Sequence, residues 1–407
     1  MTAFETGNIK TFGDVDQRSY EQLLRCAEKA DYAVLCADHH PGYSQPIGGA
    51  VAYQNHISPS GVGYDIGCGN KAAKTSLRVD EVDVPRAMDE IARRISFGVG
   101  LANEERVDHP VLDRIARADF APQRKLLSLA RDQLGTVGGG NHYVDLFSDE
   151  DGTLWVGVHF GSRGFGHKTA TGFLALAHGK RFDARAGEGG MDSPPVLLDA
   201  GSELGRAYIG AMELAGEYAY AGRDWVVDRV LRILGTDAVE EVHNHHNFAW
   251  RERHFGRDYW IVRKGCTPAF PGQQGFVGGS MGDVSVILAG LDGDEARQAL
   301  YSTVHGAGRV MSRTQAAGKR KWVRDRGTRR RVRVVVKPGA IDWNAVVSAL
   351  RERGIELRGG GADEAPGVYK SLSDVLGHHA GSVRVKNTLT PVGVAMAGAD
   401  TVDPYRD

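Results

Sequence analysis

The sequence is short of cysteine, of long apolar runs and of net charge. It has four cysteines in 407 residues, without a CxxC pair, which excludes a disulfide scaffold and favours a reducing, cytoplasmic setting. No apolar stretch approaches the roughly 20 residues that cross a membrane, and the amino terminus lacks the apolar core of a signal peptide. Because 50 basic residues nearly balance 51 acidic ones, no global field attracts nucleic acid, and any basic surface patch must be local.

Internal repeats and proline-rich linkers are also absent from the sequence. Although this length would accommodate two or three domains, similar glycine-rich motifs lie on both sides of a long helical pattern at 203–234, which favours a single domain, 1–407. Periodicity predicts that long helix in one piece or with a break. Further helices are expected at 17–30, 84–95, 120–134, 342–353 and 369–376, and strands at 32–37, 154–160, 259–263 and 284–288.

Glycine, by contrast, is abundant, at 54 residues. The sequence HGAGRVMSR begins at His305, and Gly306 and Gly308 let the backbone there approach a phosphate closely. Arg309 and Arg313 are one helical turn apart and suit phosphate oxygens. His305 is therefore a candidate nucleophile towards phosphorus, although an isolated motif of this kind is more often a turn with a hydrogen-bonded histidine.

Residues of metal-ligand type occur in similar loops. Asp65 and Cys68 are three residues apart, and a carboxylate and a thiolate at that spacing can reach one divalent ion. A cysteine alone is more often a buried structural thiol. Adjacent His245 and His246 would point to opposite faces of an extended segment, so only one of them is expected to bind a given metal. Other glycine loops beside a ligand residue or a cation lie at 138–143, 158–164, 263–266 and 278–283.

Nine motifs together carry a family resemblance: PGYSQPIGGA, GVGYDIGCG, GGGNHY, VHFGSRGFGH, HHN, RKGCTPAFPGQ, GGSMG, HGAGRVMSR and DEAPGVYKSL. In this order, across nearly the whole chain, they resemble the RtcB-type RNA ligase family. The resemblance implies an α+β fold, with a β core, surrounding helices and a central metal and nucleotide cleft. It implies GTP- and Mn²⁺-dependent joining of RNA 2′,3′-cyclic phosphate or 3′-phosphate ends to 5′-hydroxyl ends, in RNA repair or tRNA splicing, with two manganese ions per site.

The resemblance also implies roles for particular residues. His305 would be the nucleophile that becomes guanylylated. Such an attack needs a neutral ring whose second nitrogen is oriented by a nearby acid, and Glu364 is a candidate for that acid by residue type, not by resemblance. The metal ligands would be Asp65, Cys68, His142, His159 and His246, with Cys68 shared between the two ions. The nucleotide-contacting residues would be Asn141, His142, Tyr143, Val144, Asp145, His246, Asn247, Gly278, Gly279, Ser280, Met281, Ser285, His305, Gly306, Ala307, Gly308 and Met396.

Two positions depart from the family pattern. Met396 stands where the family commonly has a lysine that reads the guanine base, and Asp145 stands where a glutamate is usual. Methionine cannot donate a hydrogen bond to guanine O6. A ligase of the same chemistry that uses another nucleotide is therefore the first alternative.

From Arg313 to Arg333 there are ten lysines and arginines against one acid, Asp325, with Trp322 among them. This basic strip predicts a local RNA-tracking surface, and the alternative is a solvated hairpin. Three other tryptophans are expected in the core rather than stacked on bases: Trp155, Trp225 and Trp260. Two further alternatives for the protein are a manganese-dependent phosphoesterase on the same scaffold and a non-catalytic RNA-binding protein.

Overall fold

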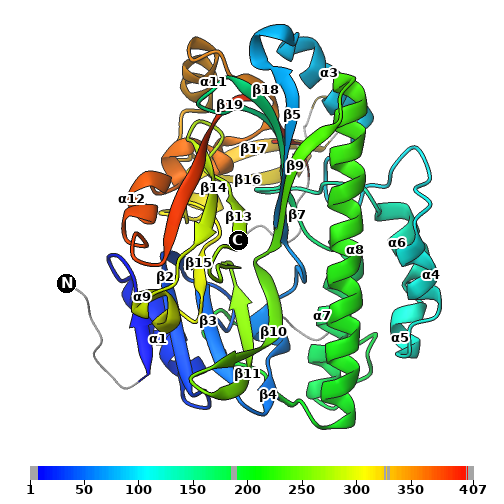
Figure 1. Ribbon diagram of the computed structural model, residues 1–407. Coiled ribbons are helices and arrows are strands. Elements are labelled where there is room, and N and C mark those ends of the chain that lie inside the picture. Colours follow the sequence, from blue (N-terminus) through cyan, green and yellow to red (C-terminus); the bar gives the residue numbers. More distant parts are fainter. Residues whose placement is uncertain (1–7, 185–189, 325–326, 328–330, 400, 402–407) are drawn as a thin grey trace.

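Two β-sheets with helices around them form the protein in the computed structural model, which describes residues 8–184, 190–324, 327, 331–399 and 401 (Figure 1). The five-stranded sheet has the order β1 (Ile9–Thr11), β2 (Tyr32–His40), β3 (Ile47–Tyr53), β11 (Arg257–Lys264) and β10 (Asn247–His254). The larger sheet has the order β13 (Gln274–Val277), β14 (Ser285–Gly290), β19 (Val383–Gly398), β6 (Tyr143–Ser148), β7 (Thr153–Phe160), β5 (Gly69–Arg78) and β9 (Ala238–His245), and β18 (Glu356–Gly360) also pairs with β19. The expected α+β class is confirmed.

The remaining strands form three small pairs. These are β12 (Cys266–Pro268) with β15 (Ser302–Val304), β4 (His56–Ile57) with β8 (Leu198–Asp199), and β16 (Lys319–Arg324) with β17 (Arg331–Lys337). The helices are α1 (Gln17–Ala27), α2 (Pro59–Val62), α3 (Val84–Arg94), α4 (Pro110–Ala116), α5 (Ala121–Arg124), α6 (Leu127–Gln133), α7 (Arg163–Ala177), α8 (Glu203–Leu234), α9 (Asp294–Gln298), α10 (Arg313–Ala317), α11 (Trp343–Glu352) and α12 (Leu372–Gly377). In the part of the chain that the structure describes, no helix is both long and apolar enough to span a membrane.

The long helix α8 is unbroken and lies along one face of the larger sheet (Figure 1). It begins where the Ser202 hydroxyl accepts a hydrogen bond from Gly205 N at 3.0 Å, and it ends at Gly235, whose φ of 72° is the left-handed conformation of a helix C-cap. Glycine within the helix permits close packing, since a Cβ at Gly216 would lie 2.7 Å from the ring of Phe248. The carboxyl-terminal half of α8 buries valines against β6 and β7 in one hydrophobic cluster.

Most expected elements are present, with shifted ends. The helix expected at 120–134 is two short helices, because the backbone leaves the α conformation at Leu126, with φ −85° and ψ 1°. The strand expected at 32–37 continues to His40, although its last residues are polar. Trp155 and Trp260 are buried and Trp225 packs against the core, as expected. That residues 1–407 form one domain stays a prediction.

The chain passes from the larger sheet to the smaller one at His246. This residue lies between the end of β9 and the start of β10. The two sheets meet where several candidate ligands lie, since β9 pairs with β5 immediately after Cys68. The fold thus brings motifs from distant parts of the sequence to one junction.

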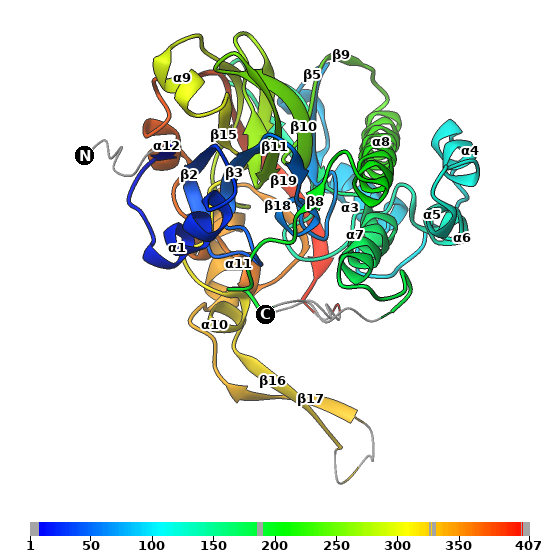
Figure 2. The ribbon, with the colours of Figure 1, turned by 90° about the horizontal axis from the view of Figure 1, so that it is seen from below.

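The basic strip lies in part on the antiparallel pair β16 and β17, which projects away from the body of the protein (Figure 2). Lys319, Lys321 and Lys337 are exposed there. Asp325, Arg326, Arg329 and Arg330 of the strip lie outside the described residues. The hairpin expected as one alternative is therefore present, and its partner stays a prediction.

Candidate active site

A cleft of about 1200 Å³ collects the predicted site residues from both sheets and their connecting loops. It is lined by every residue proposed from the sequence as a metal ligand, nucleophile or nucleotide contact, except Val144 and Ser285. Val144 is fully buried in the hydrophobic core on the opposite face of β6, so its side chain cannot contact a ligand in the cleft. Ser285 supports the loop before it, because its hydroxyl accepts a hydrogen bond from Gly279 N at 3.0 Å.

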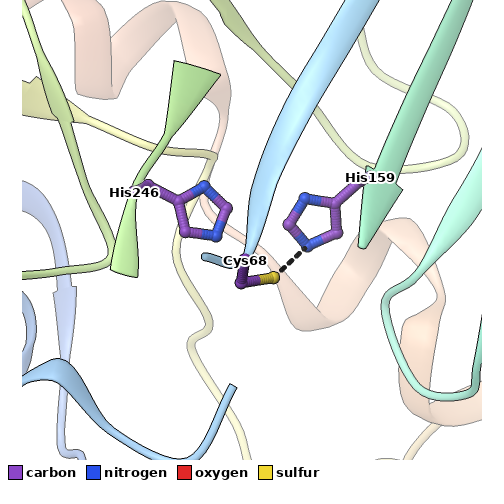
Figure 3. A group of neighbouring side chains, drawn as sticks. All are labelled: Cys68, His159 and His246. Carbon is purple, nitrogen blue, oxygen red and sulfur yellow. Dashed lines mark hydrogen bonds between the residues drawn. The ribbon is translucent and has the colours of Figure 1, made fainter. Parts of the chain in front are cut away.

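Cys68, His159 and His246 form the buried centre of the cleft (Figure 3). Their candidate ligand atoms all lie within 4.8 Å of one another. Cys68 comes immediately before β5, His159 lies near the end of β7, and His246 follows β9. Figure 3 shows the thiol of Cys68 between the two imidazoles. Each ligand therefore lies in, or directly beside, one of three neighbouring strands of the larger sheet.

A second group shares the same cysteine. Asp65, Cys68 and His142 also have ligand atoms within 4.8 Å of one another. The Sγ of Cys68 lies 3.7 Å from His142 Nε2 and 3.8 Å from His159 Nε2. A pair of metal ions bridged by a thiolate requires two groups of ligands that share one cysteine. Cys68 is shared by the two groups in this way.

Hydrogen bonds behind the cluster fix the two histidine rings. Because a carbonyl oxygen only accepts, His142 Nδ1 donates to Val137 O at 2.9 Å, and His159 Nδ1 donates in the same way to the side-chain oxygen of Asn70 at 2.7 Å. Each Nε2 therefore presents a lone pair to the cluster, as metal-bound histidines commonly do.

The charge states of Asp65, His159 and His246 suit a cation. Burial lowers the pKa of His159 and His246 well below the usual range, so both rings are neutral. Burial raises the pKa of Asp65, but the close contact with His142 and the charge of Arg163 outweigh this effect and lower the pKa to about 2. Asp65 Oδ2 lies 3.2 Å from His142 Nε2, and two lone pairs so close need a proton or a cation between them. The donor set therefore fits a divalent ion.

His305 is held by Asp38 at the other side of the cluster. Asp38 Oδ2 lies 2.6 Å from His305 Nδ1 and also accepts from His305 N at 2.9 Å. Burial raises the pKa of Asp38, but its close contacts with His305 outweigh this effect, so the carboxylate is ionised. The proton is then on Nδ1, and Nε2 carries the free lone pair. The rings of His305 and His246 have centroids 4.8 Å apart, which places the candidate nucleophile beside a candidate ligand.

The assignment of Glu364 as the group that orients His305 is wrong, because Asp38 occupies that position. Glu364 is buried and binds two arginines instead, with Arg309 Nη1 at 3.2 Å and Arg313 Nη2 at 3.3 Å. The expected helical spacing of this arginine pair is also wrong, since Arg309 lies in the loop before α10. The two guanidinium groups nevertheless converge, and both residues line the cleft.

At another part of the cleft, Tyr143 and Met396 face each other across β6 and β19. The Tyr143 hydroxyl and Asp145 Oδ1 are buried without a hydrogen-bond partner among the described residues. Burial raises the pKa of Asp145 well above its usual range. Unpaired buried polar atoms are costly, and a ligand with complementary groups would remove that cost.

Three residues that the sequence analysis gave no role support the site. Asp38 orients His305, Asn70 orients His159, and Arg223 of α8 contacts the segments around the cluster. The sequence did contain a signal for a role of Asp38, because this acid follows an apolar run and precedes two histidines. Asn70 and Arg223 carry no local signal, because their roles depend on which strands become neighbours.

An oriented histidine beside two linked groups of metal-ligand side chains is an arrangement suited to group transfer at phosphorus. A sequence model of one family, described as tRNA-splicing ligase RtcB, matches residues 22–122 and 118–397, and the chain belongs to this family. It is 31% identical to a tRNA-splicing ligase RtcB of Thermococcus kodakarensis over 89% of this chain and 87% of the relative. It is also 31% identical to an RNA-splicing ligase RtcB of Escherichia coli (74% and 80%) and 30% identical to one of Mycobacterium tuberculosis (90% and 96%).

Proposed function

We propose that the protein is an RNA ligase that joins 2′,3′-cyclic phosphate or 3′-phosphate ends to 5′-hydroxyl ends, in RNA repair or tRNA splicing. The observation that carries the proposal is the position of His305, with Nδ1 on Asp38 and the Nε2 lone pair free in the cleft. The names of the relatives support the ligase activity. The free cysteines of the described residues support a cytoplasmic setting.

In the first step, His305 Nε2 attacks the α-phosphorus of GTP. A nitrogen–phosphorus bond forms, the bond to the β-phosphate oxygen breaks, and pyrophosphate leaves. Asp38 stabilises the positive charge that develops on the imidazole ring. The glycines after His305 leave room for the backbone to approach the triphosphate, and Gly306 is bridged to Gly278 of the second glycine loop.

In the later steps, the GMP group passes from His305 to the RNA 3′-phosphate, which is first released from the cyclic form by water. The RNA 5′-hydroxyl then attacks the activated phosphate and GMP leaves. Arg309 and Arg313, held by Glu364, are placed to bind phosphate oxygens.

Asp65, Cys68, His142, His159 and His246 are the residues that would hold two Mn²⁺ ions. Bound there, the ions would neutralise phosphate charge. Imidazole and carboxylate suit manganese, while the thiol also suits softer ions such as zinc, so the choice of manganese rests on the family.

Incubation with Mn²⁺ and each labelled nucleoside triphosphate tests the proposal, with an acid-labile, alkali-stable adduct as the readout. We expect an adduct with the wild type and none with His305→Ala. His178→Ala is the matched control, because His178 lies outside the cleft at the end of α7. An adduct on His305→Ala would assign the nucleophile to another residue, and phosphate-ester hydrolysis without an adduct would support a phosphoesterase.

A further inference from the structure

Arg223 is a fully buried cation in the middle of α8. Burial lowers its pKa, but only to about 10, so the side chain is charged at neutral pH. Burying a charge is costly unless its hydrogen-bonding groups are satisfied. The partners of this guanidinium group therefore show which part of the structure depends on it.

The guanidinium group makes four hydrogen bonds. Nη1 donates to Gly67 O at 2.8 Å and to Phe160 O at 2.6 Å. Nη2 donates to His245 Nδ1 at 2.9 Å, and Nε donates to His243 Nε2 at 2.8 Å. No carboxylate among the described residues forms a direct ion pair with Arg223 within 4.0 Å.

Three of these partners adjoin candidate metal ligands in the sequence. Gly67 precedes Cys68, Phe160 follows His159, and His245 precedes His246. The three segments come from neighbouring strands, because Gly69 of β5 pairs with Phe160 of β7 on one side and with His245 of β9 on the other. One side chain therefore connects the backbone or ring next to each member of the cluster Cys68, His159 and His246.

We infer that Arg223 is the positioning residue of the metal site: three of its four hydrogen bonds set the spacing of Cys68, His159 and His246 before an ion binds. The inference rests on the metal site proposed above. A guanidinium group suits this role because its donors form a rigid planar fork, whereas a lysine ammonium is a single point on a flexible chain. Groups that hold metal ligands from behind commonly change metal affinity by about 10- to 100-fold when they are removed.

Arg263 shows that burial of an arginine does not by itself imply such a role. It is also fully buried, but it binds the carboxylate of Glu252 at 2.6 Å and the carbonyl oxygen of Leu300 at 2.8 Å. Neither partner adjoins the cluster in the sequence. Arg263→Lys is therefore a matched control for the loss of a buried guanidinium group.

Titration with Co²⁺ tests the inference through the charge-transfer absorption that a thiolate–cobalt bond produces, and calorimetry with Mn²⁺ gives a second affinity. We expect Arg223→Met to lower both affinities by about 10- to 100-fold and Arg223→Lys to lower them less. Arg263→Lys should melt at a lower temperature but keep the wild-type affinities. If Arg223→Met does not fold, Arg223→Lys decides, and wild-type Co²⁺ affinity and absorption in a folded Arg223 variant would overturn the inference.

Cys68→Ser separates this inference from the proposed function. A thiolate–cobalt band in the wild type that disappears in Cys68→Ser would establish the metal site, and equal binding by the Arg223 variants would then reject only the role of Arg223. If the wild type itself shows no Cys68-dependent binding, the metal site and the role of Arg223 both fall.

Discussion

Asp38 and His305 are 267 positions apart in the sequence, yet a single carboxylate oxygen of Asp38 contacts the ring nitrogen and the backbone amide of His305. The same oxygen lies 3.3 Å from Gly306 N. Asp38 therefore fixes the tautomer of the ring and the conformation of the glycine loop together. This double contact explains how a histidine in a glycine-rich, otherwise pliable segment keeps one orientation.

Replacing Asp38 with asparagine should slow formation of the nucleotide adduct by about 10- to 100-fold, because a charge-assisted hydrogen bond of about 1.5–3 kcal/mol is lost. The measurement is the single-turnover rate of adduct formation. Asp149→Asn is the control, since Asp149 is also buried and bonded, to Trp155 Nε1 at 3.0 Å, but lies outside the cleft. An unchanged rate in Asp38→Asn would remove Asp38 from the mechanism.

Replacing Cys68 with serine should weaken Mn²⁺ binding by more than about tenfold, because a neutral hydroxyl is a poorer ligand than a thiolate. Equilibrium dialysis measures the affinity, and sealing of RNA should decline with it. Cys26→Ser alters another buried thiol outside the cleft and should retain wild-type binding. Full metal occupancy in Cys68→Ser would mark Cys68 as a structural thiol.

Replacing Glu364 with glutamine should raise the KM for RNA about tenfold, since Arg309 and Arg313 would lose the carboxylate that holds them together. Adduct formation with GTP should change little. Glu252→Gln is the comparison, because Glu252 binds the buried Arg263 outside the cleft and should affect stability alone. The opposite pattern, slow adduct formation with a normal KM, would assign the arginine pair to the triphosphate.

Removing charge from the projecting hairpin should weaken RNA binding and reduce its salt dependence. With Lys319, Lys321 and Lys337 changed to alanine, each lost phosphate contact should lower the slope of log affinity against log salt by about 0.7–0.9. The control changes three exposed lysines outside the cleft: Lys29, Lys125 and Lys180. Equal slopes for both triple variants would identify the hairpin as a solvated surface.

The sequence was informative wherever a ligand and its glycine loop are neighbours in the chain. The positions of Cys68, His159 and His305 in one cleft follow from such local motifs, and the alternation of side chains in an extended segment separated His246 from His245. Val144 was included because its neighbours belong to a motif, although the same alternation turns its side chain into the core.

Contacts between distant segments could not be predicted in this way. Glu364 was chosen by residue type as the acid that orients His305. The acid that lies beside His305 is Asp38, because β2 packs near β15. The polar end of β2 resembles a loop by composition, yet Asp38 and His39 are buried there because His305 and the backbone of Asp16 and Cys36 supply hydrogen bonds. Such partners exist only once the tertiary structure has formed.

Met396 should make the wild type weakly selective between GTP and ATP. Its side chain lines the cleft and is nearly buried, and Asp145 lies on the same face of the paired strands, opposite Val394. A thioether contacts either purine without preference. Burial raises the pKa of Asp145 and so favours the protonated carboxyl group, which both donates and accepts hydrogen bonds and complements either base edge.

Met396→Lys should therefore sharpen the preference for GTP by about 10- to 100-fold, which corresponds to one charge-assisted hydrogen bond of about 1.5–3 kcal/mol to guanine O6. The new ammonium group would repel the adenine amino group and would also favour the ionised form of Asp145, which accepts from guanine N1 and N2.

Competition between labelled GTP and ATP in the adduct assay measures the preference. Met396→Leu, which adds no donor, should match the wild type. If the wild type uses GTP strictly and Met396→Lys has the same preference, a group other than residue 396 selects the base.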